Sequence, residues 1–261
     1  MSIHNTAIVE DGAQVADSAS VGPFCRIGPD AQIGDGAVLV SHVVVSGRTH
    51  IGARTIVHPF AVLGGPPQHL HYKNEPTSLR IGEDVIIREH ATMNPGTPAG
   101  GGETHIGDRG FFMAGAHVGH DCQVGNDVIF ANNATLGGHA KIGDHSFLGG
   151  LCAIHQNCRV GDYAFIGGCA AVVQDIIPYA SAYGNHARIA GLNIIGMKRR
   201  NTPRATIHKI RAAFRTLFGE AGTFKDRLEQ TRSEYGECVE VSKIIDFVDA
   251  GSARSLMPLK R

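Results

Sequence analysis

The sequence lacks tryptophan, and only 6% of its 261 residues are aromatic. This composition excludes a core dominated by large aromatic side chains. The sequence also lacks any apolar stretch that approaches the ~20 residues needed to span a bilayer. Its N-terminus has neither the basic segment nor the apolar run of a secretory signal peptide. We therefore expect a cytoplasmic protein without a transmembrane segment.

A net charge is absent as well, because 24 basic residues balance 24 acidic ones. No overall electrostatic field favours nucleic acid, so an anionic ligand needs a local binding site. None of the six cysteines belongs to a CxxC pair, and they fall at strand-like positions: Cys25, Cys122, Cys152, Cys158, Cys169 and Cys238. We expect buried free thiols in a reducing compartment rather than disulfides or a metal knuckle.

Glycine, in contrast, is abundant, with 34 residues, and it accompanies a repeat with a period of six. The apolar positions of this repeat are first Ile3, Val9, Val15, Val21, Ile27, Ile33, Leu39, Val45, Ile51, Val57, Leu63, Ile81, Ile87 and Met93. After a shift of one residue they are Ile106, Phe112, Val118, Val124, Phe130, Leu136, Ile142, Leu148, Ile154, Val160, Ile166 and Val172. Such a period matches neither the ~3.6 residues of an α-helical turn nor the ~2 of a strand.

The repeat predicts a hexapeptide parallel β-helix, which is an all-β fold. Each unit of six residues forms one short strand and one corner, with the apolar residue inside, and three units close a coil of 18 residues. Successive coils stack at ~4.8 Å, the spacing of hydrogen-bonded strands. We expect this β-helix to occupy residues 1–186.

Two segments interrupt the repeat. The first, residues 64–80, is expected to take the place of about one coil, and the second, residues 94–105, is rich in glycine and proline. Long insertions in a regular solenoid tend to be functional, although tolerated surface variation is the alternative.

The pattern changes near the C-terminus. After an irregular stretch, residues 174–200, a helical face of Ile207, Ile210, Phe214, Leu217 and Phe218 begins behind Thr202, a possible N-cap, with Pro203 at the first helical position. A charged segment and a further helix around residues 241–248 follow. We expect residues 187–261 to form a small helical domain that caps the solenoid.

Histidines gather on one edge of the predicted prism. His120 lies in the same column as Gly138 and Gln156, while His139 and His155 each lie one residue from that column, and His117 is nearby. A rigidly placed imidazole suits general-base catalysis near neutral pH, although a single corner histidine is more often a surface residue. A prism has no deep cavity, so we expect a ligand cleft between subunits of a cyclic trimer.

Three motifs carry a resemblance to a known family: "AHVGHDCQVGNDVIFANNATLGGHAKIG", "AIHQNCRVGDYAFIGGCAAVVQDIIPY" and "GNHARIAGLNIIGMKRR". With these motifs the chain resembles, over essentially its whole length, the UDP-N-acetylglucosamine 3-O-acyltransferase family of lipid A biosynthesis. The resemblance implies a left-handed β-helix and a homotrimer with active sites between subunits. It also implies transfer of an (R)-3-hydroxyacyl group from acyl carrier protein to the sugar 3-hydroxyl. The acyl donor is carried on phosphopantetheine, and no other cofactor is implied.

The resemblance also implies roles for the residues in these motifs. His120 matches the general base that takes the hydroxyl proton, and His117 matches a histidine that supports substrate binding. The Gly138 N–H corresponds to the donor that stabilises the tetrahedral oxyanion, and His139 to a residue that orients the substrate. No metal is implied.

Other matches concern the two substrates. His155 and Gln156 correspond to a pair beside the sugar and the acyl-pantetheine arm. Asn193, Arg199 and Arg200 correspond to positions where an arginine reaches the nucleotide diphosphate, and a solvated basic turn is the alternative interpretation. Gly168 corresponds to the position that limits the depth of the acyl groove; a glycine there favours a longer chain, whereas Phe165 would shorten the groove.

The acceptor loop departs from the family pattern. Gln68 and Tyr72 agree with it, but His69 and His71 replace the usual aspartate and lysine, and Ile195 replaces an acidic residue. These changes leave open an acceptor with a 3-amino group or a different nucleotide sugar. For the acidic acyl carrier protein, the candidate contact residues are basic: Arg199, Arg200, Arg204, His208 and Lys209.

Two interpretations from other classes are open for this sequence. Carbonic anhydrases with this fold hold zinc with three histidines, a role open here to His117, His120 and either His139 or His155. A scaffold without enzymatic activity would explain the repeat but not the histidine edge.

Overall fold

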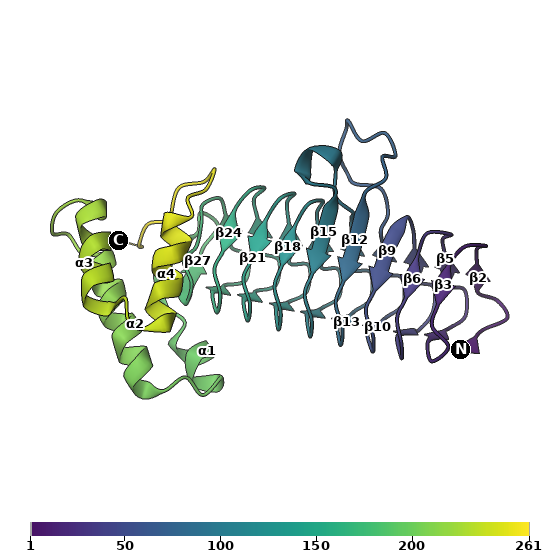
Figure 1. Ribbon diagram of the computed structural model, residues 1–261, viewed down its shortest axis with the longest axis horizontal. Coiled ribbons are helices and arrows are strands. Elements are labelled where there is room, and N and C mark those ends of the chain that lie inside the picture. Colours follow the sequence, from purple (N-terminus) through teal and green to yellow (C-terminus); the bar gives the residue numbers. More distant parts are fainter. Residues whose placement is uncertain (1, 261) are drawn as a thin grey trace.

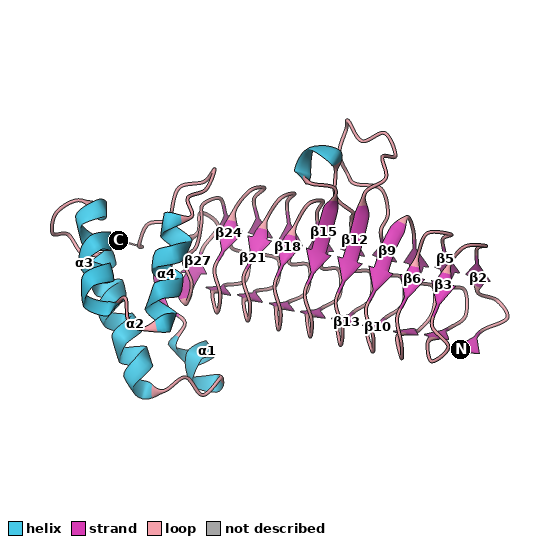
Figure 2. Ribbon diagram, in the orientation of Figure 1, coloured by secondary structure: helices cyan, strands magenta, loops and turns pink. Residues whose placement is uncertain are grey.

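The computed structural model describes residues 2–260. A long parallel β-helix carries a group of helices at its C-terminal end, and the N-terminus lies at the opposite tip (Figure 1). Figure 2 shows that the strands of the solenoid are short and that loops form the corners between them. The hexapeptide pattern therefore predicted the architecture correctly.

Three sheets form the faces of the prism. Sheet A contains β1 (Ser2–Ile3), β4 (Ser20–Val21), β7 (Val38–Leu39), β10 (Ile56–Val57), β13 (Ile86–Ile87), β16 (Phe111–Phe112), β19 (Ile129–Phe130), β22 (Phe147–Leu148), β25 (Phe165–Ile166), β27 (Ala180–Tyr183) and β28 (Arg188–Leu192). Sheet B contains β2 (Ile8–Val9), β5 (Arg26–Ile27), β8 (Val44–Val45), β11 (Val62–Leu63), β14 (Thr92–Met93), β17 (His117–Val118), β20 (Thr135–Leu136), β23 (Ala153–Ile154) and β26 (Ala171–Val172). Sheet C contains β3 (Gln14–Val15), β6 (Gln32–Ile33), β9 (Arg48–Ile51), β12 (Ser78–Ile81), β15 (Glu103–Ile106), β18 (Gln123–Val124), β21 (Lys141–Ile142) and β24 (Arg159–Val160).

Each predicted apolar position is the last residue of a strand among β1 to β26. Residues such as Ile27, Leu39 and Ile51 are fully buried, and each such side chain contributes ~1.5–3 kcal/mol relative to an exposed one. Ile3, at the open N-terminal end, is 40% exposed because no coil lies beyond it. Strands separated by one coil pair in parallel register, for example Val9 with Ile27. The left-handed winding stays a prediction.

The two insertions are shorter than predicted. β12 begins at Ser78 and β15 at Glu103, so the last residues assigned to each loop belong to strands. β12 pairs directly with β9, which shows that the first insertion bulges from a corner and replaces no coil. The second contains a 3₁₀ turn, η1 (Pro98–Gly100). Both insertions project from the same side of the solenoid (Figure 1).

The C-terminal region is more regular than predicted. Residues 174–200 include β27, β28 and a short helix, α1 (Ile194–Arg199), and the predicted domain boundary falls in the turn between β27 and β28. The other helices are α2 (Arg204–Leu217), α3 (Phe224–Tyr235) and α4 (Val239–Asp249). Pro203 is the N-cap of α2, so this helix begins one residue later than predicted. The charged segment is helix α3, whose capping box joins Thr223 and Asp226.

The predicted apolar face of α2 packs inward, with Ile207, Ile210 and Leu217 buried. None of the helices among residues 2–260 is long and apolar enough to cross a membrane. All six cysteines are free thiols, but Cys169 is exposed, so the expected burial is wrong for this residue. It occupies a corner with φ of 56°, where the side chain faces solvent rather than the core.

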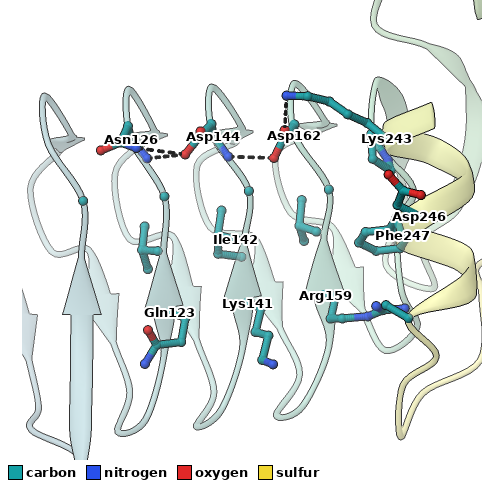
Figure 3. A pocket seen from close by; sticks show the side chains of 18 of the residues that line it. Gln123, Asn126, Lys141, Ile142, Asp144, Arg159, Asp162, Lys243, Asp246 and Phe247 are labelled. Carbon is teal, nitrogen blue, oxygen red and sulfur yellow. Dashed lines mark hydrogen bonds and ion pairs between the residues drawn. The ribbon is translucent and has the colours of Figure 1, made fainter. Parts of the chain in front are cut away.

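Helix α4 stands beside the last coil of the solenoid, and its side chains and those of sheet C line a groove of about 620 Å³ (Figure 3). The backbone N–H of Asn126 donates to Asp144, the backbone N–H of Asp144 donates to Asp162, and Lys243 of α4 donates to Asp162. A column of polar corner side chains therefore connects the solenoid to the helical region. None of the predicted site residues lines this groove.

Candidate active site

His120 forms a close pair with the residue that follows it. Its Nδ1 atom lies 2.7 Å from the Asp121 carboxylate, whose side chain is fully buried. The same carboxylate accepts hydrogen bonds from the backbone N–H of Thr97 at 2.8 Å and from its hydroxyl at 2.7 Å. Because the carboxylate accepts from Nδ1–H, the neutral imidazole leaves Nε2 unprotonated. This is the arrangement that a general base requires.

Gly138 and His139 lie beside this pair on the next coil. A Cβ atom at position 138 would lie only 2.5–3.0 Å from ring atoms of His120, so only glycine lets the imidazole occupy its position. The ring of His139 meets that of His120 edge-on, with centroids 5.0 Å apart. Among the described residues, the Gly138 N–H donates to no other protein group, which leaves it available to a ligand.

His117 lies on sheet B, one strand position before the corner. Its Nδ1 atom is 2.7 Å from the Thr92 hydroxyl of the preceding coil. Burial lowers the pKa of His117, and the nearby His120 lowers this pKa further. His117 is therefore a neutral hydrogen-bonding group at neutral pH.

The first insertion brings two further histidines to the same edge. The ring of His69 lies edge-on to that of His120, with centroids 5.2 Å apart, and His71 lies 5.7 Å from His69. The amide of Asn94 donates to the Gly65 carbonyl at 3.1 Å and so anchors the start of the insertion. Gln68 is exposed on this insertion.

His155 does not join the imidazole cluster. Its Nδ1 atom contacts the Arg254 guanidinium at 2.8 Å, and Arg254 also donates to the carbonyl of Gln156 at 3.2 Å. The C-terminal tail therefore covers part of the next coil. The column through His120 and Gly138 continues to Gln156. His155, however, contacts Arg254, whereas His120 and His139 lie beside Asp121.

Four of the remaining predicted residues line a separate pocket of about 790 Å³ at the junction of sheet A and α1, namely Phe165, Asn193, Arg199 and Arg200. Arg199 and Arg200 are exposed at its wall, and the Phe165 ring stacks on that of Phe147 at 5.1 Å. Asn193 caps α1 by accepting from the Gly196 N–H and donates to the Tyr163 carbonyl, so it also fixes the helix.

Gly168 is exposed at the corner after β25. A Cβ atom there would lie 3.3 Å from the Gly150 carbonyl oxygen, so a larger residue would fit only tightly. Gly168 is not among the residues that line the pocket with Arg199 and Arg200. Within one chain, the histidine cluster therefore lies at the sheet B edge, and the arginine pocket lies over sheet A.

Sequence reasoning missed several residues of the site. Asp121 follows the key histidine directly, so the "HD" pair was the signal available for it. Thr97 and Arg254 carried no such signal, because only the folded insertion and tail bring them to Asp121 and His155.

A β-helix of hexapeptide repeats with a His–Asp pair at its edge defines a hexapeptide transferase. The bacterial transferase hexapeptide model matches residues 12–47 and 103–138, and the second-domain model of UDP-N-acetylglucosamine O-acyltransferase matches residues 175–257. The chain is 52% identical to acyl-[acyl-carrier-protein]–UDP-N-acetylglucosamine O-acyltransferase of Caulobacter vibrioides, over 98% of this chain and 97% of that one. It belongs to the acyl-[acyl-carrier-protein]–UDP-N-acetylglucosamine O-acyltransferase family.

Solved structures agree with this assignment. LpxA from Acinetobacter baumannii superimposes with a TM-score of 0.94 at 40% identity, covering 98% of this chain and 99% of that one. The UDP-N-acetylglucosamine acyltransferase from Campylobacter jejuni gives 0.94 at 37% identity, covering 99% and 100%. The carbonic anhydrase and scaffold interpretations are therefore wrong for this chain.

Proposed function

We propose that this protein transfers an (R)-3-hydroxyacyl chain from acyl carrier protein to the 3-position of UDP-N-acetylglucosamine, the first step of lipid A synthesis, with His120 as general base. The observation that carries the mechanism is the 2.7 Å contact between His120 Nδ1 and the buried Asp121 carboxylate. Family membership supports the reaction, and this pair supports the assignment of the base.

The reaction follows from this geometry. His120 Nε2 takes the proton of the sugar hydroxyl as its oxygen attacks the thioester carbonyl. The Asp121 carboxylate stabilises the imidazolium that forms, and the Gly138 N–H donates to the oxyanion of the tetrahedral intermediate. Collapse of the intermediate expels the pantetheine thiolate, which takes the proton from His120. The sugar is itself the nucleophile, so no covalent enzyme intermediate is required.

A homotrimer is part of the proposal, because the two groups of site residues lie on different faces of one prism. His117 and His120 face outward at sheet B and its edge, whereas Phe165, Arg199 and Arg200 surround the pocket at sheet A. Packing the sheet B edge of one subunit against sheet A of the next would join the two groups. The cleft would then hold the sugar and acyl group near His120 and the diphosphate near the arginines.

The remaining roles follow from this arrangement. His139, His155 and Gln156 would contact the sugar and the pantetheine arm, and Phe165 and Gly168 would line the acyl groove. Acyl carrier protein would dock on a basic surface whose exposed members are Arg199, Arg200, Arg204, His208 and Lys209. We assign the protein to the cytoplasm, where carrier protein and nucleotide sugar are both available.

The test is the His120→Ala variant in an acyl-transfer assay with purified protein. We expect turnover to fall ~10²–10⁴-fold, because a positioned general base contributes that much. His105→Ala, on the outward face of sheet C, is the matched control and should retain activity. Turnover of His120→Ala within a few fold of the wild type would overturn the mechanism.

A second acceptor is favoured by one observation, the two imidazoles in the acceptor loop. His69 lies 5.2 Å from the His120 ring, where the family commonly has an aspartate, so a sugar with a 3-amino group is an alternative substrate. The assay should compare UDP-N-acetylglucosamine with its 3-amino analogue, using carrier proteins loaded with acyl chains of several lengths. Preference for the amine would select the alternative, and efficient use of the ordinary sugar would exclude it.

A further inference from the structure

The histidine cluster brings together three side chains that can also bind a metal ion. His120, Asp121 and His139 each offer one ligand atom, and these three atoms lie within 4.8 Å of one another. The Asp121 carboxylate oxygen that meets His120 Nδ1 at 2.7 Å also lies 3.8 Å from His139 Nε2. Two imidazoles thus converge on a single buried carboxylate oxygen.

These distances suit a transition-metal ion. Zinc bonds of ~2.0–2.2 Å in tetrahedral geometry place neighbouring donors ~3.4 Å apart, and the observed 2.7 and 3.8 Å lie on either side of that value. Imidazole and carboxylate are ligands that Zn²⁺ accepts readily. Bringing those two distances to the tetrahedral value takes shifts of about half an ångström. The third pair, His120 with His139, lies within 4.8 Å and has to close further.

His69 on the first insertion lies outside this group of three and would become a fourth ligand only after its ring moves toward the ion. The His69 ring lies edge-on to His120, with centroids 5.2 Å apart, and His71 follows at 5.7 Å. Because His69 belongs to a corner insertion and not to the packed prism, it can approach the ion without disturbing a coil. Water can complete the coordination if it does not.

We propose that a divalent transition-metal ion, with Zn²⁺ as the representative, binds His120, Asp121 and His139, together with His69, and inhibits the enzyme. The ion would replace the Nδ1 proton of His120. The neutral imidazole would then carry its proton on Nε2, where it can no longer accept one from the sugar hydroxyl. Inhibition therefore rests on the role proposed above for His120, whereas metal binding does not.

The test is a titration of chelator-treated protein with CoCl₂, followed by visible absorption of the bound ion and then by displacement with ZnCl₂. We expect one ion per chain. His139→Asn should weaken binding ~100-fold or more, because loss even of groups behind the ligands weakens metal sites 10–100-fold. His69→Asn, on the insertion, is a second variant for which folding of the prism is not at stake. His155→Asn, whose imidazole contacts Arg254, is the matched control and should bind as the wild type does.

Each outcome decides one point. Equal cobalt affinity in the wild type and His139→Asn, or no absorption band at millimolar cobalt, would overturn the metal site. Binding accompanied by loss of acyl transfer, with recovery on addition of a chelator, supports both the site and the base. Full acyl transfer by the zinc-loaded protein would leave the site in place and overturn the role of His120.

Discussion

At the scale of single residues, the site depends on close packing between coils. Gly138 leaves the space that the His120 ring occupies, since a Cβ there would lie 2.5–3.0 Å from three ring atoms. We expect Gly138→Ala to displace the imidazole and lower kcat by ~10²-fold, the effect of a misplacement near 1 Å. Gly150→Ala is the control, because its Cβ would meet no atom closer than 3.4 Å. Equal kcat for the two variants would contradict this account.

His117 makes stability depend on pH. Burial lowers its pKa below the ordinary value of 6.5, so the unfolded chain binds a proton that the folded chain resists. The stability that neutral His117 contributes to the fold is fully present above pH 6.5 and is lost as the pH falls below that value. Urea unfolding at pH 8 and pH ~5.5 measures how much the free energy of unfolding falls in acid. We expect a smaller fall for His117→Asn than for the wild type, because asparagine cannot be protonated and still offers Thr92 a partner. An unchanged difference between the two pH values would exclude this origin.

Some residues of the site can be predicted from the sequence and others cannot. The spacing of about 18 residues alone predicts that His120, Gly138 and His139 lie together, because residues one coil apart stack in the solenoid. It could not place Thr97 or Arg254, which reach the site from an insertion and from the C-terminal tail. Irregular segments obey no period, so their contacts follow only from the folded backbone.

At the scale of elements, the periodic part of the chain was again predictable from sequence and the irregular part was not. The six-residue pattern identified the position of every strand from β1 to β26, because each needs one buried apolar residue and one corner. It gave no information about residues 174–200, where antiparallel pairing of β27 with β28 replaces the parallel repeat. Helix α3 was missed because few of its residues are apolar, and its start is marked instead by the Thr223 capping box.

Two ion pairs lie where helix α4 meets the end of the solenoid, and they should differ in strength. Arg159 and Asp175 are largely buried, and Arg159 also stacks on Phe247 of α4 at 4.1 Å, whereas Lys243 of the other pair is 42% exposed. We expect Asp175→Ala to lower the free energy of unfolding by ~3–5 kcal/mol, since it leaves a buried cation unpaired. Lys243→Ala should cost at most ~1 kcal/mol. Equal losses in denaturant titrations would show that burial does not separate the two pairs.

At the scale of the whole molecule, the three faces of the prism differ in chemistry. Sheet A presents an apolar row to the outside, which consists of Val38, Ile56, Ile86, Phe111, Ile129, Phe147 and Phe165. Sheet C presents polar and basic residues at the equivalent positions, namely Gln14, Gln32, His50, Arg80, His105, Gln123, Lys141 and Arg159. At the corner between sheets A and B, the exposed rings of Phe24 and Phe60 alternate with those of His42 and His90, with centroids 4.9–5.1 Å apart. Because apolar faces of this length often mark interaction sites, we expect this face to contact another subunit in the proposed trimer.

The final prediction concerns this face. Ile86, near the middle of the apolar row, is 38% exposed in the single chain, and its neighbours in the sheet are Ile56 and Phe111. Light scattering should give the wild type three times the chain mass of 27.6 kDa. Ile86→Glu would bury a charge at the subunit interface, so we expect smaller species and loss of acyl transfer. Gln123→Glu on sheet C is the matched control and should remain trimeric and active. A fully active wild-type monomer would show that one chain contains a complete site, and the joining of the sheet B edge to a neighbouring sheet A would then be wrong.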